Sequence, residues 1–207
     1  MKRKLIVMSI ICLEAIVLFE GCNVDDNYSY TETFTSKYAK LLQKDPNYKL
    51  NVNDLDIRQD ISDNSIFCYS TATNMRDKVR ELIKGLREIP IDCNGGISTD
   101  GGYECLLDVS DLDNAADDRS AYFAQGNEIN DEEIARNNGY VAETIRGGTF
   151  VQEGFSEAAM IDAIEKKMKT DSEFCSYIVS KTTKDLGVGH YDQDGKRYWS
   201  FMLGDRE

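Results

Sequence analysis

The stretch GVGHYDQDGKRYWSFMLGD, residues 187–205, decides the fold because it predicts two strands and the turn between them. Val188 and His190 alternate with glycines, and apolar side chains recur at every second position of residues 199–203. A period of two is typical of strands that turn one face to a core. Residues 192–195 supply the turn. Asp192 and Asp194 also resemble the start of a calcium loop, but its later ligands are missing, so we expect a turn only.

The only histidine of the chain, His190, lies on the first of these strands. A Ser-His-Asp or Cys-His catalytic system would have to use it. A catalytic zinc ion usually has three protein ligands, with imidazoles common among them. One histidine among scattered carboxylates does not form such a set. We therefore expect a partly packed strand residue, no metal and no cofactor, and we expect Trp199 to be buried in the core.

Four upstream segments have the apolar period of amphipathic helices: 71–90, 110–124, 131–139 and 156–171. Ser110 with Asp113, and Asp131, are expected to cap the second and third of them. The expected inward side chains of the second helix are Leu112, Ala115, Ala116 and Phe123. Helices together with a terminal hairpin predict an α+β fold.

The charge balance limits the partners. The chain has 207 residues, 41% of them hydrophobic, and a net charge of −13. Phosphate binding requires clustered Lys and Arg, so nucleic acid is excluded as a partner. Anionic membrane surfaces are disfavoured for the same reason. We expect contact with a membrane only through a lipid anchor.

Residues 1–21 have the pattern of an export signal, with a basic start followed by a short apolar run. Glu14 interrupts that run, which disfavours the alternative of a transmembrane anchor. Cys22 follows directly and stands where a bacterial lipoprotein would be lipidated, although the preceding Phe19 and Glu20 match poorly. Free secretion and lipid anchoring at the cell envelope both remain open.

Residues 22–62 are polar and rich in Asp and Asn, although 36–45 could form a short helix. We expect a polar tether or a loosely packed N-terminal extension, followed by a single domain over residues 63–207. A purely structural surface protein with this segment as its stalk is a further hypothesis.

If Cys22 carries lipid, four cysteines remain for disulfides outside the cytoplasm: Cys68, Cys93, Cys105 and Cys175. A bond between Cys93 and Cys105 would close a short glycine-rich loop and add roughly 3 kcal/mol in the chain-entropy model. Cys175 would then be available to Cys68. That loop lacks the Gly-Lys-Ser/Thr end of a nucleotide-binding loop, so we do not expect it to bind phosphate.

Several segments, taken in order, resemble the CAP superfamily (cysteine-rich secretory proteins, antigen 5 and plant pathogenesis-related proteins). GYVAETIRGG (139–148) is similar to the family's GENIA motif, with Glu143 as its glutamate. FCSYIVSKTTKDLGVGHY (174–191) and YWSFMLG (198–204) resemble its closing motifs. The resemblance implies a three-layer α-β-α sandwich with a central antiparallel sheet.

In many members of that family, two histidines and two glutamates surround a central cleft and can bind a divalent metal. The resemblance places the first histidine position at Asn130, the second at Phe174 and the helical glutamate at Glu165, beside Glu143. Both imidazoles are therefore missing. The same comparison implies that Phe174 makes the cleft floor apolar, which favours an apolar or mixed ligand.

The leading hypothesis is a secreted or envelope-tethered CAP-like domain that is not an enzyme. It would bind a lipid- or sterol-like small molecule, or an extracellular protein. The alternative is a carboxylate-dependent hydrolase centred on Glu143. A structural role for Glu143, paired with Arg146 or Arg119, is also open.

Overall fold

The predicted hairpin lies at the centre of the main sheet in the computed structural model, which describes residues 37–63, 66, 69, 72–94, 106–180 and 182–205. Strand β5 (Asp185–Gln193) turns at Asp194 and Gly195, which both have positive φ, and returns as β6 (Lys196–Asp205). Aspartate and glycine tolerate this left-handed conformation better than most residues do. The alternation of the sequence therefore predicted both the strands and their turn.

The main sheet has the strand order β3-β5-β6-β4. Strand β4 (Thr144–Glu153) pairs with β6 in antiparallel register, and β3 (Leu107–Asp108) pairs with β5 in parallel register. The expected purely antiparallel sheet is therefore wrong at this one edge. Two short strands, β1 (Leu50–Asn51) and β2 (Ile91–Asp92), form a separate parallel pair.

The helices make the fold α+β, and four of them follow the four predicted amphipathic segments. They are α2 (Lys37–Lys44), α3 (Ile57–Ser62), α4 (Met75–Glu88), α5 (Ser110–Ala124), α6 (Asp131–Asn137), α7 (Glu157–Thr170) and α8 (Ser172–Val179), with a 3-10 turn at Val52–Asp54. Helix α8 was not predicted, because its two turns follow α7 after a single residue, Asp171, which caps it. None of the helices in the described ranges is long and apolar enough to cross a bilayer.

Two predicted caps are wrong. Helix α5 begins after Val109, which makes no side-chain cap, and Ser110 is already helical. Asp113 instead bonds to strand β5. Helix α6 is capped by Asn130, and Asp131 is its first helical residue. Both errors have the same cause. Asp113 bonds to β5 and Asp131 bonds to Arg119 of α5, so neither carboxylate caps its own helix.

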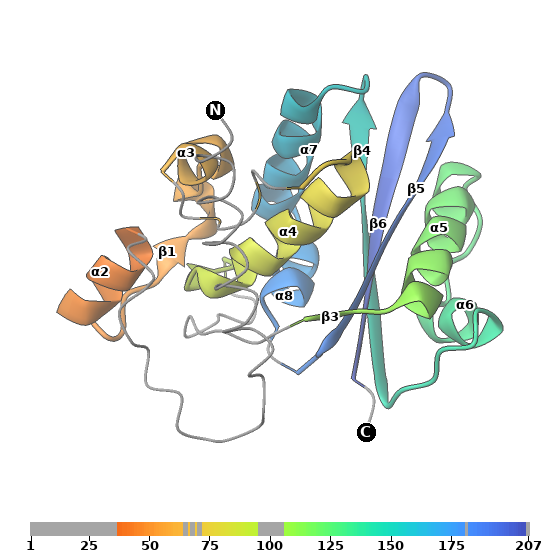
Figure 1. Ribbon diagram of the computed structural model, residues 1–207, viewed down its shortest axis with the longest axis horizontal. Coiled ribbons are helices and arrows are strands. Elements are labelled where there is room, and N and C mark those ends of the chain that lie inside the picture. Colours follow the sequence, from red (N-terminus) through yellow and green to blue (C-terminus); the bar gives the residue numbers. More distant parts are fainter. Residues whose placement is uncertain are drawn as a thin grey trace, which may run out of the picture. The chain divides into compact units, whose positions relative to one another are not determined.

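The two faces of the main sheet are packed differently (Figure 1). One face carries Phe150, Trp199, Phe201 and Leu203, which join the core formed with α4, α7 and α8. The burial of Trp199 confirms the prediction. The other face lies against α5 and α6 in a smaller core that includes Leu112 and Met202.

Helix α5 approaches strand β5 at backbone distance. A Cβ on Gly187 would collide with the backbone of Leu112, and one on Gly189 with the backbone of Asp117. The glycines of the GVG stretch are therefore required by packing. Leu112, Ala115 and Ala116 face this contact and are buried as predicted, whereas Phe123 is 40% exposed and was wrongly placed inward.

Residues 37–62 belong to the packed domain, and the expectation of a loose tether is wrong for them. Tyr38, Val52, Leu55 and Ile57 are buried in the main core. Asp60 is fully buried and accepts hydrogen bonds of 3.0 Å from the Tyr38 hydroxyl. Isolated apolar residues separated by polar ones gave no clear periodic signal, so the sequence boundary at residue 63 came too late.

Several sequence predictions lie outside the described residues. They are the export signal over 1–21, the lipidation candidate Cys22, the tether up to residue 36, and Cys68 and Cys105.

Candidate functional site

A cleft of about 250 Å³ lies along the middle of β4, between α5 and α8. Phe123 and Ile129 form one wall, and Phe174 and Tyr177 form the other. The remaining lining residues are polar or glycine: Arg119, Asp131, Gly147, Gly148, Thr149, Lys167, Asp171 and Glu173. The cleft therefore combines aromatic walls with charged groups.

Two consecutive glycines of β4 bring the two walls close to the strand. A Cβ on Gly147 would collide with the Arg119 side chain, and a Cβ on Gly148 would collide with Phe174 and Phe201. Because successive strand residues face opposite sides, each glycine opens one face. A larger residue at either position would displace a cleft wall.

The Arg119 side chain is 10% exposed and bonds to three neighbours. Its Nε donates to Asp131 Oδ1 at 2.7 Å, one Nη donates to Thr149 Oγ1, and the other donates to the Gly147 carbonyl oxygen at 3.1 Å. Thr149 Oγ1 also lies 2.6 Å from Ser200 Oγ. A buried charge is tolerated only when it is paired and hydrogen-bonded. This guanidinium is therefore committed to holding α5, α6 and β4 together.

On the opposite wall, Lys167 and Asp171 form an ion pair of 2.7 Å. Burial raises the pKa of Asp171, but hydrogen bonds from Lys167 and from the Phe174 backbone N–H outweigh it, so the pKa lies below its ordinary value. Phe174 is 3% exposed and packs edge-on against Phe150 and Phe201. The charges of Lys167 and Asp171 on this wall therefore neutralise each other, and Phe174 is held among buried aromatic rings.

At the mouth of the cleft, the Tyr177 hydroxyl donates to Glu173. This hydrogen bond, together with partial burial and the charge of Glu173, raises the pKa of Tyr177 to about 12. The Arg146 guanidinium lies 5.6 Å from the centre of the Tyr177 ring. Tyr177 is therefore a neutral hydrogen-bonding group at neutral pH.

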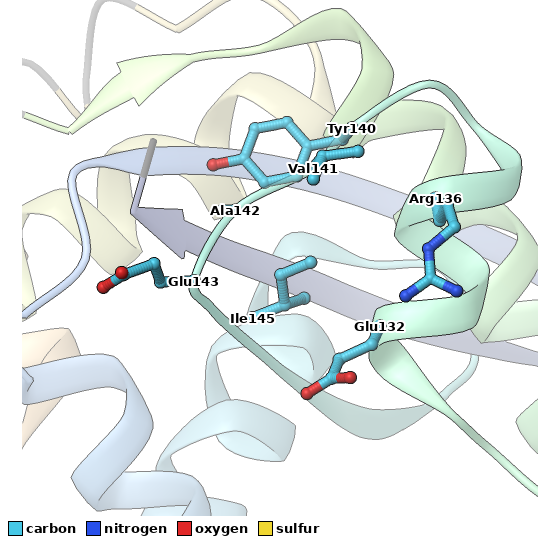
Figure 2. Close-up of a pocket in the computed structure, with 7 residues that line it drawn as sticks. All are labelled: Glu132, Arg136, Tyr140, Val141, Ala142, Glu143 and Ile145. Carbon is cyan, nitrogen blue, oxygen red and sulfur yellow. The ribbon is translucent and has the colours of Figure 1, made fainter. Parts of the chain in front are cut away.

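Glu143 lies outside this cleft. It is exposed and lines a separate depression of about 90 Å³ with Glu132, Arg136 and Tyr140. Figure 2 shows the Glu143 carboxylate pointing away from Glu132 and Arg136. Arg119, one of its two expected partners, pairs with Asp131 instead.

The other two expected cleft residues have structural roles. Asn130 is exposed and caps α6 by accepting from the Glu133 N–H at 3.1 Å. Glu165 accepts from the Ile57 N–H at 2.9 Å and from Lys169 Nζ at 2.7 Å, which ties α7 to α3. Of the four positions that the family resemblance brings together, the structure places only Phe174 in the larger cleft.

The disulfide pairing was left open by the sequence, and the structure forms neither of the two bonds considered for Cys93 and Cys175. Cys93 is bonded to Cys175, across 82 residues, and not to Cys105. Cys93 follows β2, and Cys175 is the neighbour of Phe174 on α8. The bond therefore fixes the helix that forms one cleft wall. Sequence spacing suggested the shorter loop because it could not show that α8 lies beside β2.

His190 is a partly buried strand residue, as predicted. Its ring lies 4.9 Å from that of Trp199. Burial lowers its pKa below the ordinary value, and the positive charges of Arg197 and Arg76 add to this. Its backbone N–H donates to Asp117 Oδ1 at 2.7 Å. Among the described residues, no group of three or more His, Cys, Asp and Glu side chains is arranged to hold a metal ion.

Sequence reasoning missed the role of Arg119 and of the glycine pair. Arg119 follows Leu112, Ala115 and Ala116 at helical spacing, so a charged residue on the apolar face of α5 was the available signal. Two adjacent glycines within a strand were a second signal, because they often mark a close approach.

No family model and no curated protein matches this sequence. Among solved structures, a cysteine-rich secretory protein from Staphylococcus aureus is similar, with a TM-score of 0.41 and 18% sequence identity. The match covers 62% of this chain and 37% of that protein's chain.

Proposed function

We propose that this chain is a CAP-like domain that binds a ligand in the cleft between β4, α5 and α8 and does not catalyse a reaction. Helices packed on both faces of the sheet support the proposed three-layer sandwich. The Cys93–Cys175 disulfide and the export-signal pattern support a secreted or envelope-bound location.

The observation that carries the binding proposal is the state of the charged groups around Phe174. Arg119 is bonded to three protein groups, and Lys167 is paired with Asp171. A general acid or base must be free to exchange a proton with a substrate. Here the charges hold the aromatic walls in position, which suits binding.

The size of the cleft favours part of a protein over a whole lipid or sterol. Pockets for drug-sized ligands occupy roughly 300–1,000 Å³. A cleft of about 250 Å³ accommodates a few side chains or a short piece of main chain. Of the two expected ligand classes, an extracellular protein is therefore the better candidate.

A fragment screen by NMR tests the proposal. We expect indole and N-acetylglycinamide, an aromatic and a main-chain probe, to shift the amide resonances of Gly147, Gly148 and Thr149. Phe123→Ala should weaken the indole response because Phe123 lines the cleft, while the matched Tyr122→Ala, equally exposed on the same helix, should not. Shifts confined to the Glu143 depression, or no shifts at all, would overturn the proposal.

A further inference from the structure

We propose that the cleft accepts an extended, basic peptide segment, which adds to the sheet as a strand along the free edge of β4. This inference rests on the binding function proposed above and names the partner class. It follows from the different treatment of the two sides of the main sheet.

Among the strands that the structure describes, β4 is at the edge of the sheet and pairs only with β6. In an antiparallel ladder, alternate residues of an edge strand direct their N–H and C=O groups outward, where another chain can pair with them. The cleft lies against residues 147–149, in the middle of this ten-residue strand. Gly147, Gly148 and Thr149 are themselves buried beneath the two walls, so a strand that pairs here must enter between Arg119 and Phe174.

The edge of β5 is closed by other parts of the fold. Strand β3 and Val109 cover its first residues, and the Val109 N–H donates to the Leu186 carbonyl at 3.0 Å. Further along, Asp113 accepts from the Val188 N–H at 2.8 Å, and Asp117 accepts from the His190 N–H at 2.7 Å.

Two arginines of α4 hold these carboxylates in place. Arg80 contacts both oxygens of Asp113 at 2.9 Å, and Arg76 contacts both oxygens of Asp117 at 2.8 and 2.9 Å. Proteins commonly block free edges to prevent unwanted pairing. Within the described part of the chain, the bond from Arg119 to the Gly147 carbonyl is the one hydrogen bond to the β4 main chain beyond the β6 ladder. The other outward N–H and C=O groups of β4 are therefore the ones that a partner strand would bond.

The walls indicate the chemistry of the partner. Asp131 is neutralised by Arg119, and Asp171 by Lys167. Glu173 lies exposed at the cleft mouth, and among the described residues its one hydrogen-bond donor is the neutral Tyr177 hydroxyl. The chain carries a net charge of −13, which attracts cationic partners. A Lys or Arg next to Glu173 would complete the charge balance, while the aromatic walls accommodate apolar side chains.

The probe is an end-blocked heptapeptide in which lysine and valine alternate. Its matched control has the same side chains, but alternate backbone nitrogens are methylated, which removes the donors needed for strand addition. We expect the first peptide to shift the resonances of residues 147–149 and to slow amide exchange on β4. The methylated peptide should bind about tenfold more weakly, because several main-chain hydrogen bonds are lost.

Charge is tested with a matched pair of exposed glutamates. Glu173→Lys should weaken heptapeptide binding about fivefold at low salt, whereas Glu132→Lys, which lies outside the cleft, should change it less than about twofold.

The outcomes separate this inference from the binding function. If the methylated peptide binds equally well, or if indole alone binds, the cleft is a binding site but strand addition is wrong. Self-association of the protein through β4 at high concentration, without peptide affinity, would also refute the peptide as occupant. If no probe perturbs residues 147–149, both proposals fail.

Discussion

The two long sides of the main sheet differ in how the fold treats their backbone groups. Along β5, Asp113 and Asp117 accept the outward N–H groups, and arginines of α4 hold both carboxylates. Along β4, Arg119 binds one carbonyl, and the rest of the strand's middle faces a cleft. The same helix, α5, supplies all three of these side chains. One helix therefore closes one edge and shapes the opening at the other.

The largest effect should come from removing the disulfide, because it fixes α8, which forms one wall of the cleft at β4. In the chain-entropy model, closing a loop of 82 residues is worth about 4.5 kcal/mol. We expect the double variant Cys93→Ala/Cys175→Ala to lose much of that free energy of unfolding in urea titrations. Residue-resolved hydrogen exchange should show α8 and β4 loosening before α5 and β5. Uniform loosening, or loosening of β5 first, would contradict the comparison.

The next largest effect should come from removing the charge of Arg119, which lines the cleft at β4. Arg119→Leu leaves the Asp131 carboxylate without its partner and removes one of the two hydrogen bonds of the Thr149 hydroxyl. Breaking such a buried ion pair costs about 3 kcal/mol. The control Arg136→Leu alters an exposed arginine of α6 and should cost less than about 0.5 kcal/mol. Equal losses in the two variants would show that Arg119 does not hold the cleft together.

Opening the closed edge should have a smaller effect on stability. Asp113→Ala leaves the Val188 N–H without its acceptor and removes one of the carboxylates paired with Arg80. It should cost about 2 kcal/mol, because hydrogen bonds to charged groups are lost. The neighbouring Asn114→Ala, on the exposed side of α5, serves as control. We also expect light scattering to detect self-association of the Asp113 variant as β5 becomes available for pairing. A variant as stable and monomeric as the control would refute the edge-closing role.

The smallest effect is the contribution of His190, on β5, to the pH dependence of the unfolding free energy. The folded pKa of His190 is lowered by burial and by nearby arginines, so between the folded and unfolded pKa values the unfolded chain binds more protons. The unfolding free energy of the wild type should therefore fall as the pH drops through about 6.5. His190→Gln should remove this part of the pH dependence, which the difference between the two proteins isolates. A parallel pair of pH curves would show that His190 does not titrate differently in the fold.

The sequence predicted the elements whose side chains repeat with a clear period. The hairpin of β5 and β6 and helices α4 and α7 are of this kind, because their regularly spaced apolar residues lie in the main core. It did not predict β4, since Gly147 and Gly148 interrupt the strand pattern at the very point where the cleft needs space.

The candidate site was predicted only in part. Phe174 lies in the larger cleft, but Glu143 faces a different depression, and Glu165 is occupied by the backbone of α3. Asp113 was expected to help cap its own helix, and Asp117 was given no role, because no periodic pattern indicates that a carboxylate will bond to the backbone of a distant strand. Such contacts depend on how α5 approaches β5, which the spacing of residues does not encode.

The most direct test of the central claim is residue-resolved amide hydrogen exchange of the intact protein, with and without the lysine–valine heptapeptide. We predict slow exchange of the Val188 and His190 amides in both states, because Asp113 and Asp117 hold them. Alternate amides of β4 around residues 147–149 should exchange quickly in the free protein and slowly with the peptide. Equal protection of both edges without peptide, or no change on β4 when it is added, would contradict the account.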